Sequence, residues 1–286
     1  VRTMSHGGIQ ARLVDQVREL QGNGFEIDVL THFEPPGELA AAVVEHGGRV
    51  MQGCHPRTPL RHLKFTGNLL RENGPYDVVH GHHSGLWGPV MWLAARAGVP
   101  VRIVHCHGDV VRARPRVPER LYCWGGRHLG RRFATHAIAV SEHLAKPFWG
   151  QFAYSDCRFR VLGDGHCFDD FAGRESVITA RTELGLPENA RVVGHVGGFA
   201  PQKNHAFILD IAARLAAEPD IWFLFVGDGE LRPAIEREFR RLPGVGERAV
   251  FAGCRDDVPR LMLGAMDCFV FPSLSEGLGG VVLEAQ

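Results

Sequence analysis

The stretch Arg191-Val-Val-Gly-His-Val-Gly-Gly-Phe199 is a short apolar run that ends in two adjacent glycines. Helical spacing follows over His205–Ala217, and the next apolar run, Trp222–Val226, again ends at a glycine, Gly227. Strands that are apolar throughout and separated by helices are typical of buried parallel sheets with right-handed crossovers. This part of the chain therefore predicts an α/β fold with glycine-rich loops after its strands.

The same alternation extends toward both ends of the chain. Further apolar runs predict strands at Phe25–Thr31, Asp77–His80, Val101–His105, His136–Val140, Arg158–Leu162, Ala249–Phe251 and Cys268–Phe271. Helical spacing recurs over Ile9–Leu20, Leu86–Ala97 and Leu231–Leu242. A polar, loosely helical segment interrupts the series over 169–189. We predict two Rossmann-like doubly wound domains, 1–168 and 190–286, joined by this linker.

Length and composition fit this organisation. A chain of 286 residues suits two moderate domains, and its net charge of zero gives no global reason to expect nucleic-acid binding. Its seven cysteines form no Cys-x-x-Cys pair, which argues against a disulfide framework or a zinc ribbon and favours a cytoplasmic protein. The chain starts in a turn and stops at Gln286, in what reads as the first turns of a helix, so we expect it to be truncated at both termini.

Ligands of open parallel sheets bind at the carboxyl ends of the strands. The segments predicted there are His6-Gly7-Gly8, His80–His83, His105–Gly108, Gly197–Phe199 with Lys203, Gly227–Gly229 and Pro272–Glu284. Glycines in such loops let backbone N–H groups approach an anion, and helix N-termini favour negative charge. These loops predict a binding site for an anionic ligand.

The last of these segments is the most informative. Glu276 lies in the loop after a strand, and Glu284 lies inside the helix that follows. Gly279 and Gly280 between them expose backbone donors that could neutralise a diphosphate without a metal. The alternative is a glycine-rich helix start with two solvated glutamates. For Gly227 and its neighbours the structural reading is favoured, because a turn between strand and helix needs glycine whatever it binds.

Histidines end two neighbouring strands, at His80, His82, His83, His105 and His107. A metal cluster is conceivable, but no carboxylate or cysteine completes a recognisable ligand spacing. We therefore predict no metal site, and expect one histidine to contact a substrate hydroxyl or phosphate.

The segment Arg112–Arg132 is rich in arginine, with Tyr122 and Trp124 among the arginines. A basic stretch with interfacial aromatics can lie on an anionic membrane surface. A solvated helix face is an equally good interpretation. The sequence thus leaves open a peripheral location at the inner face of a membrane.

The order of motifs resembles that of family 4 glycosyltransferases, the retaining GT-B enzymes, and most closely those of exopolysaccharide and capsule synthesis. The similar stretches are Met4–Gln10, Asp77–His82, Val101–Gly108, Ala139–Glu142, Val196–His205, Phe225–Gly229, Val250–Gly253 and the Glu276/Glu284 pair. No single motif is specific, but the spaced glutamates with Lys203 and the Gly-Gly loop form a specific combination.

The resemblance implies a transferase that moves a sugar from a nucleoside-diphosphate donor, UDP-linked rather than GDP-linked, to a glycan or lipid-linked acceptor without a metal. Domain 1–168 would be the acceptor side, and 190–286 an incomplete nucleotide-sugar-binding domain. By position, His107 and Glu276 would be the catalytic residues, near the transferred sugar. The donor would be bound by Gly7, Gly8, Gly198, Lys203, Leu278, Gly279, Gly280, Val281 and Glu284.

Two departures from the family pattern keep alternatives open. Gly198 stands where the family usually has an arginine, and Gly163-Asp164-Gly165-His166-Cys167 replaces the usual Pro-Asn-Gly-Ile-Asp. Loss of that arginine would fit a GT-B protein that has lost catalysis and serves as an assembly partner. A nucleotide-sugar 2-epimerase of the same fold is a third possibility. A NAD-dependent enzyme is disfavoured, because no Gly-x-Gly-x-x-Gly directly follows a first strand.

Overall fold

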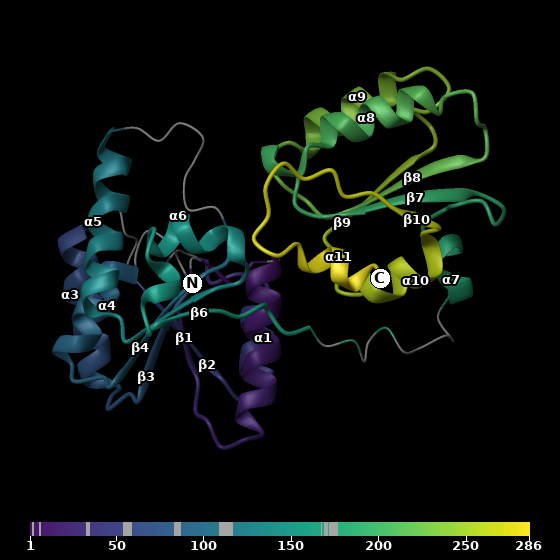
Figure 1. Cartoon of the computed structure of the whole chain (residues 1–286). Coiled ribbons are helices and arrows are strands. Elements are labelled where there is room, and N and C mark those ends of the chain that lie inside the picture. Colours follow the sequence, from purple (N-terminus) through teal and green to yellow (C-terminus); the bar gives the residue numbers. More distant parts are fainter. Residues whose placement is uncertain are drawn as a thin grey trace. The chain divides into compact units, whose positions relative to one another are not determined.

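The computed structural model describes residues 1, 3–5, 7–32, 35–53, 59–82, 87–108, 117–166, 168, 171 and 177–286 (Figure 1). Side chains of residues 59–60, 117–123 and 177–179 are outside that description. The chain forms two compact units, Val1–Gly165 and His166–Gln286. Both are built from parallel strands and helices, which confirms the predicted α/β class.

The first unit contains two parallel sheets. A two-stranded sheet pairs β1 (Asp28–Thr31) with β2 (Arg49–Gln52). A four-stranded sheet has the order β3-β4-β5-β6, with β3 at Val78–Gly81, β4 at Val101–Cys106, β5 at His136–Ala139 and β6 at Phe159–Val161. The sequence pattern did not predict β2, because this short strand has only two apolar residues between polar ones.

Helices of the first unit connect these strands. They are α1 (Gly8–Gln21), α2 (Ala40–Glu45), α3 (Pro59–Glu72), α4 (Trp87–Arg96), α5 (Val117–Phe133) and α6 (Ala145–Trp149), with 3-10 turns η1 (Glu142–Leu144) and η2 (Ala153–Ser155). Helix α4 packs closely on α5, since a side chain on Gly88 would lie 2.0 Å from the carbonyl oxygen of Gly126. Within the described residues, no helix is both long and apolar enough to cross a membrane.

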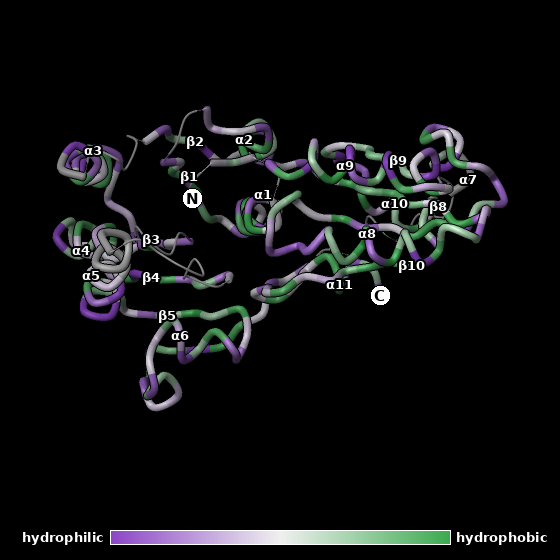
Figure 2. The backbone as a smooth tube through the Cα atoms, turned by 90° about the horizontal axis from the view of Figure 1, so that it is seen from above, coloured by the Kyte–Doolittle hydropathy of each residue, from purple (hydrophilic) through white to green (hydrophobic). Residues whose placement is uncertain are grey.

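The second unit is a doubly wound sheet in the order β10-β7-β8-β9, with β7 at Arg191–Val196, β8 at Ile221–Val226, β9 at Ala249–Gly253 and β10 at Cys268–Phe269. Successive side chains of a strand point to opposite faces. Phe223 and Phe225 of β8 therefore enter a core on one face, and Leu224 and Val226 enter a second core on the other. Figure 2 shows β8 mostly in the colour of hydrophobic residues.

Helices cover both faces of this sheet. Helices α8 (His205–Arg214) and α9 (Arg232–Arg241) supply the first core, while α7 (Val177–Glu183) and α10 (Val258–Ala265) supply the second. The remaining elements are the 3-10 turn η4 (Pro201–Lys203) and α11 (Gly280–Glu284). Helix α7 lies within the segment predicted as a linker, yet Ala180 is fully buried in the second core. This part of 169–189 is thus integral to the second unit.

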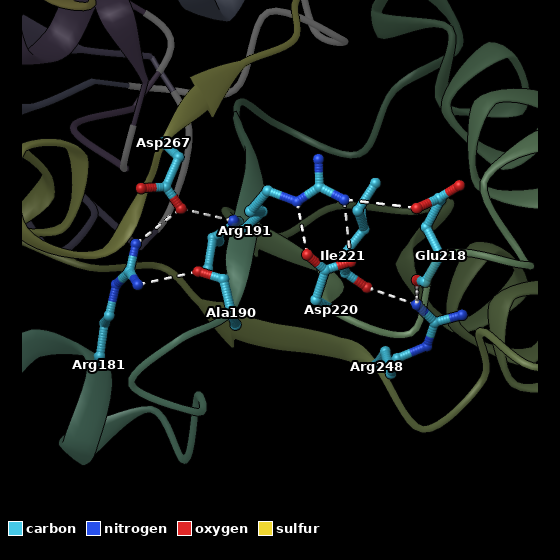
Figure 3. A network of polar contacts seen from close by, with 9 residues as sticks. Arg181, Ala190, Arg191, Glu218, Asp220, Ile221, Arg248 and Asp267 are labelled. Atoms are coloured by element: carbon cyan, nitrogen blue, oxygen red, sulfur yellow. Dashed lines mark hydrogen bonds and ion pairs between the residues drawn. The ribbon is translucent and has the colours of Figure 1, made fainter.

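A network of ion pairs joins the starts of the four strands in the second unit (Figure 3). Arg191 pairs with Asp220 at 2.7 Å, and Arg181 pairs with Asp267 at 2.7 Å. The Asp267 carboxylate also accepts a hydrogen bond from the Val192 N–H, and Arg248 donates to the Ile221 carbonyl. Exposed pairs of this kind contribute about 0–1 kcal/mol each. The network lies at the amino ends of the strands, opposite the edge where ligands of open parallel sheets bind.

Candidate functional site

The loop after β7 and the loop after β10 are held together in the second unit. Strands β7 and β10 are paired neighbours, so their following loops start at the same edge of the sheet. The Leu274 N–H donates to the Gln202 carbonyl at 2.8 Å, and the Asn204 side chain donates to the Pro272 carbonyl at 3.2 Å. These bonds fix the Lys203 loop against the segment that carries Glu276.

Lys203 and Glu276 form an ion pair, with 2.6 Å between Nζ and Oε1. Both side chains are largely buried, and Nζ also lies 4.6 Å from the centre of the Phe271 ring. The two residues are far apart in sequence and were predicted separately, as diphosphate-binding and sugar-binding. The structure brings them together, so each neutralises the other until an anionic ligand competes for Lys203.

The glycine-rich segment bends into α11 directly beside this pair. Gly279 adopts a left-handed conformation (φ 70°, ψ 50°), which favours glycine, and Gly280 begins the helix. A β-carbon on Gly279 would lie 3.9 Å from Cβ of Glu276. Leu278 ends the loop and Val281 belongs to the first turn of α11. The predicted phosphate-binding backbone is therefore adjacent to the Lys203–Glu276 pair.

Glu284, at the end of α11, faces His166. The distance between His166 Nδ1 and Glu284 Oε1 is 3.4 Å, and the imidazole is nearly buried. The ring lies against Gly280, where an added β-carbon would be 2.4 Å from Cε1. His166 was missed as a site residue. One feature of the sequence could have pointed to it: in the altered motif 163–167, His166 replaces the isoleucine of the family pattern.

The glycines after β7 and β8 differ in how much space a side chain would have. Gly227 has a φ of 132°, and an added β-carbon would lie 2.2 Å from the Gly197 carbonyl oxygen. This close approach gives Gly227 a packing role, in line with the structural reading of its motif. Gly198, by contrast, has room, since the nearest atom to an added β-carbon is the Asp228 carbonyl oxygen at 3.6 Å.

In the first unit, Gly7 precedes α1 and Gly8 is its first residue. Among the described residues, and apart from its chain neighbours and the backbone of α1, no atom lies within 4 Å of a β-carbon placed on Gly8. A β-carbon on Gly7 would lie 2.7 Å from Oε1 of Gln10. Both glycines are exposed at the start of α1, and their contact with a diphosphate stays a prediction.

Four histidines cluster at the carboxyl ends of β3 and β4. His80 Nε2 lies 3.2 Å from His105 Nδ1, and His82 Nδ1 lies 2.8 Å from His107 Nε2. Strands β3 and β4 are parallel neighbours. Along each strand the two histidines are two residues apart, His80 with His82 and His105 with His107, so that all four rings lie together. Burial, followed by the nearby His107, lowers the pKa of His80 to about 4 and that of His105 to about 3. Both rings are therefore neutral at neutral pH.

His107 also contacts Asp164, with 3.2 Å between Nδ1 and Oδ2. Asp164 follows β6 and was predicted only as part of the altered motif, so its place beside His107 was missed. Two sets of side chains offer ligand atoms within 4.8 Å of one another: His80 with His82 and His105, and His105 with His107 and Asp164. The absence of a metal site stays a prediction.

Solved structures define the class of this fold. HepE from Anabaena superimposes with a TM-score of 0.81 at 22% identity, over 100% of this chain and 76% of that one. WaaG, a glycosyltransferase involved in lipopolysaccharide biosynthesis, gives a TM-score of 0.71 at 19% identity, over 99% of this chain and 76% of that one. The two parallel α/β units with loops at their carboxyl ends have the GT-B fold.

Sequence comparison gives the family. The family described as Glycosyltransferase Family 4 matches residues 6–165, and Glycosyl transferases group 1 matches residues 190–286. The chain belongs to glycosyltransferase family 4, which confirms the resemblance drawn from its motifs. The EpsF glycosyltransferase of Bacillus subtilis is 31% identical over 99% of this chain and 74% of its own length. An Escherichia coli galactosyltransferase, which uses UDP-Gal and a diphosphoundecaprenol-linked GlcNAc, is 30% identical over 76% of this chain and 57% of its own length.

Proposed function

We propose that the chain transfers a sugar from a nucleoside-diphosphate donor to a glycan or lipid-linked acceptor, with retention of the anomeric configuration, in exopolysaccharide or cell-surface glycan synthesis. UDP is the favoured nucleotide. The structure of HepE contains UDP-glucose, and the E. coli relative acts with UDP-Gal. The GlcNAc-diphosphoundecaprenol acceptor of the E. coli relative supports a lipid-linked acceptor.

The observation that carries this proposal is the Lys203–Glu276 pair beside Gly279 and Gly280. In the bound state Lys203 contacts the diphosphate, and the backbone N–H groups from Leu278 to Val281 face its oxygens. Glu276 then accepts hydrogen bonds from the donor sugar, and Glu284 from the ribose. Gly7 and Gly8 contact the diphosphate, and His107 lies near the transferred sugar. Charge that develops on the leaving diphosphate is stabilised by these fixed donors, without a metal.

A donor titration tests the proposal. We expect Lys203→Ala to weaken the affinity for a UDP-sugar by roughly ten- to a hundredfold, because it removes a hydrogen bond from a charged donor and leaves Glu276 unpaired. Isothermal titration calorimetry without added metal measures the effect. Lys146→Ala, at an exposed residue of α6, is the matched control and keeps the wild-type affinity. Equal affinity in wild type and Lys203→Ala would contradict the proposal; the anomeric configuration of the product, read by NMR, tests retention.

Gly198 favours a second candidate, a non-catalytic partner protein. Glycine has no cationic side chain that could bind a diphosphate, although a β-carbon would fit at this position. Gly198→Arg restores the family's charge without a clash at the β-carbon. Robust turnover by the wild-type chain would exclude this candidate, whereas activity that appears only in Gly198→Arg would support it.

We also propose that α5 contacts an anionic membrane. Trp124 on this helix is 64% exposed. Two of the arginines predicted for this surface are partly engaged elsewhere, since Arg127 and Arg131 donate to the carbonyls of Pro147 and Phe148 on α6. Residues 112–116 of the predicted segment lie outside the described residues.

Sedimentation with lipid vesicles tests this contact. We expect the chain to bind phosphatidylglycerol vesicles, and to bind less as salt concentration rises, because the attraction between arginines and anionic lipid is screened. Trp124→Ala lowers the bound fraction, since an aromatic ring anchors the helix at the interface. Equal sedimentation with neutral and anionic vesicles would contradict it.

A further inference from the structure

Asp164 and His107 meet at the carboxyl edge of the first unit's sheet. His107 directly follows β4, and Asp164 follows β6, two strands away in the same sheet. The two side chains are only 4% and 14% exposed. The geometry points to Asp164 as a positioning residue that orients the His107 ring and keeps a proton on its Nδ1. This inference rests on the proposed place of His107 near the transferred sugar.

The hydrogen-bond chemistry of the two groups sets the direction of the bond. An ionised carboxylate can only accept, so the 3.2 Å contact requires a proton on His107 Nδ1. A neutral imidazole carries one proton, and the partner of one nitrogen decides which nitrogen holds it. Asp164 therefore selects the Nδ1–H form of His107, in which Nε2 is the accepting nitrogen of the ring.

The imidazole of His82 contacts the other nitrogen of the His107 ring. His82 Nδ1 lies 2.8 Å from His107 Nε2, so the three side chains form a line Asp164–His107–His82. Burial and the adjacent histidines lower the pKa of His82 well below its usual value. A ring held at both nitrogens has little rotational freedom. The line therefore fixes both the angle and the tautomer of His107.

The identity of residue 164 matters for this role. Asp164 stands where the family motif commonly has asparagine. An asparagine can accept a hydrogen bond through its carbonyl oxygen, but it can also present its NH₂ group, so it does not impose a single tautomer on a histidine. The carboxylate of this chain does, and its negative charge strengthens the bond. Carboxylates that orient a metal-bound histidine change activity by about 10- to 100-fold when removed, and we expect an effect of the same order here.

NMR of the whole chain tests the inference directly. Long-range ¹H–¹⁵N spectra of the histidine rings show which nitrogen carries the proton, and loss of one set of signals in His107→Gln assigns His107. We expect Nδ1 of His107 to be protonated in the wild type, and a mixture of the two neutral tautomers in Asp164→Asn. An unprotonated Nδ1 in the wild type, or the same spectrum in both proteins, would overturn the inference.

Kinetics supply a second readout that a merely structural role would not give. We expect Asp164→Asn to lower kcat by roughly 10- to 100-fold with little change in donor KM, and to add nothing further in the His107→Gln background. Asp77→Asn, an exposed carboxylate ahead of β3, is the control and retains wild-type kinetics. If Asp164→Asn lowers kcat equally in the wild type and in the His107→Gln protein, the inference is overturned. If the wild type transfers no sugar, the proposed function fails, while the NMR result still decides the role of Asp164.

Discussion

Exchange of Glu276 for glutamine is expected to lower kcat/KM for the nucleotide-sugar donor by roughly two to three orders of magnitude. The side chain keeps its shape but loses the negative charge that strengthens hydrogen bonds from sugar hydroxyls. It also loses the 2.6 Å ion pair that orients Lys203. One substitution thus removes a contact to the transferred sugar and disturbs the group that binds the diphosphate.

Steady-state kinetics with a UDP-sugar measure this loss. Glu247→Gln is the matched control, because Glu247 is exposed and precedes β9 at the amino ends of the strands. In a double-mutant cycle, Glu276→Gln and Lys203→Ala should be non-additive, since residues in direct contact share their interaction energy. A Glu276→Gln protein with near-normal kcat/KM, or strictly additive losses, would show that the pair does not act as one site.

Substitution of Gly227 by alanine is expected to lower the free energy of unfolding by about 2–4 kcal/mol. The φ of 132° is a conformation that side chains rarely adopt. The new β-carbon would also lie 2.2 Å from the Gly197 carbonyl oxygen, so the loops after β7 and β8 would have to separate. Backbone atoms cannot move aside as a flexible side chain can.

Urea unfolding of wild type, Gly227→Ala and Gly198→Ala measures this effect. Gly198→Ala is the control from the neighbouring loop, because its β-carbon would make only an ordinary contact at 3.6 Å. We expect that control to stay within about 0.5 kcal/mol of the wild type. A Gly227→Ala protein as stable as the control would refute the close-packing explanation.

Most of the sheet architecture could be predicted from the sequence. Runs such as Trp222–Val226 are apolar at every position, because helices bury both faces of the strand, and this pattern is hard to mistake. Strand β2 was missed because only two of its four residues are apolar, too few to stand out as a strand. Helix α7 was assigned to a linker because most of its residues are polar, although Ala180 is fully buried.

Within the candidate site, the sequence predicts residue positions that depend only on the nearest strand, but not contacts that depend on strand order. Lys203, Glu276 and the glycines before α11 lie in loops that directly follow strands, so the strand pattern alone places them at the carboxyl edge. Their ion pair needed one further fact, the pairing of β10 with β7. Without an observed strand order, the neighbour of each loop could not be known.

The pattern of residues along the chain predicts the α/β class, the positions of most strands and the loops that carry chemistry. Which groups come into contact depends on the folded arrangement: Asp164 with His107, His166 with Glu284, and Gly227 with the Gly197 backbone. Periodicity and turn chemistry act over a few residues, whereas each of these contacts joins segments separated by whole strands and helices. Such contacts follow from strand order and packing, which no local pattern encodes.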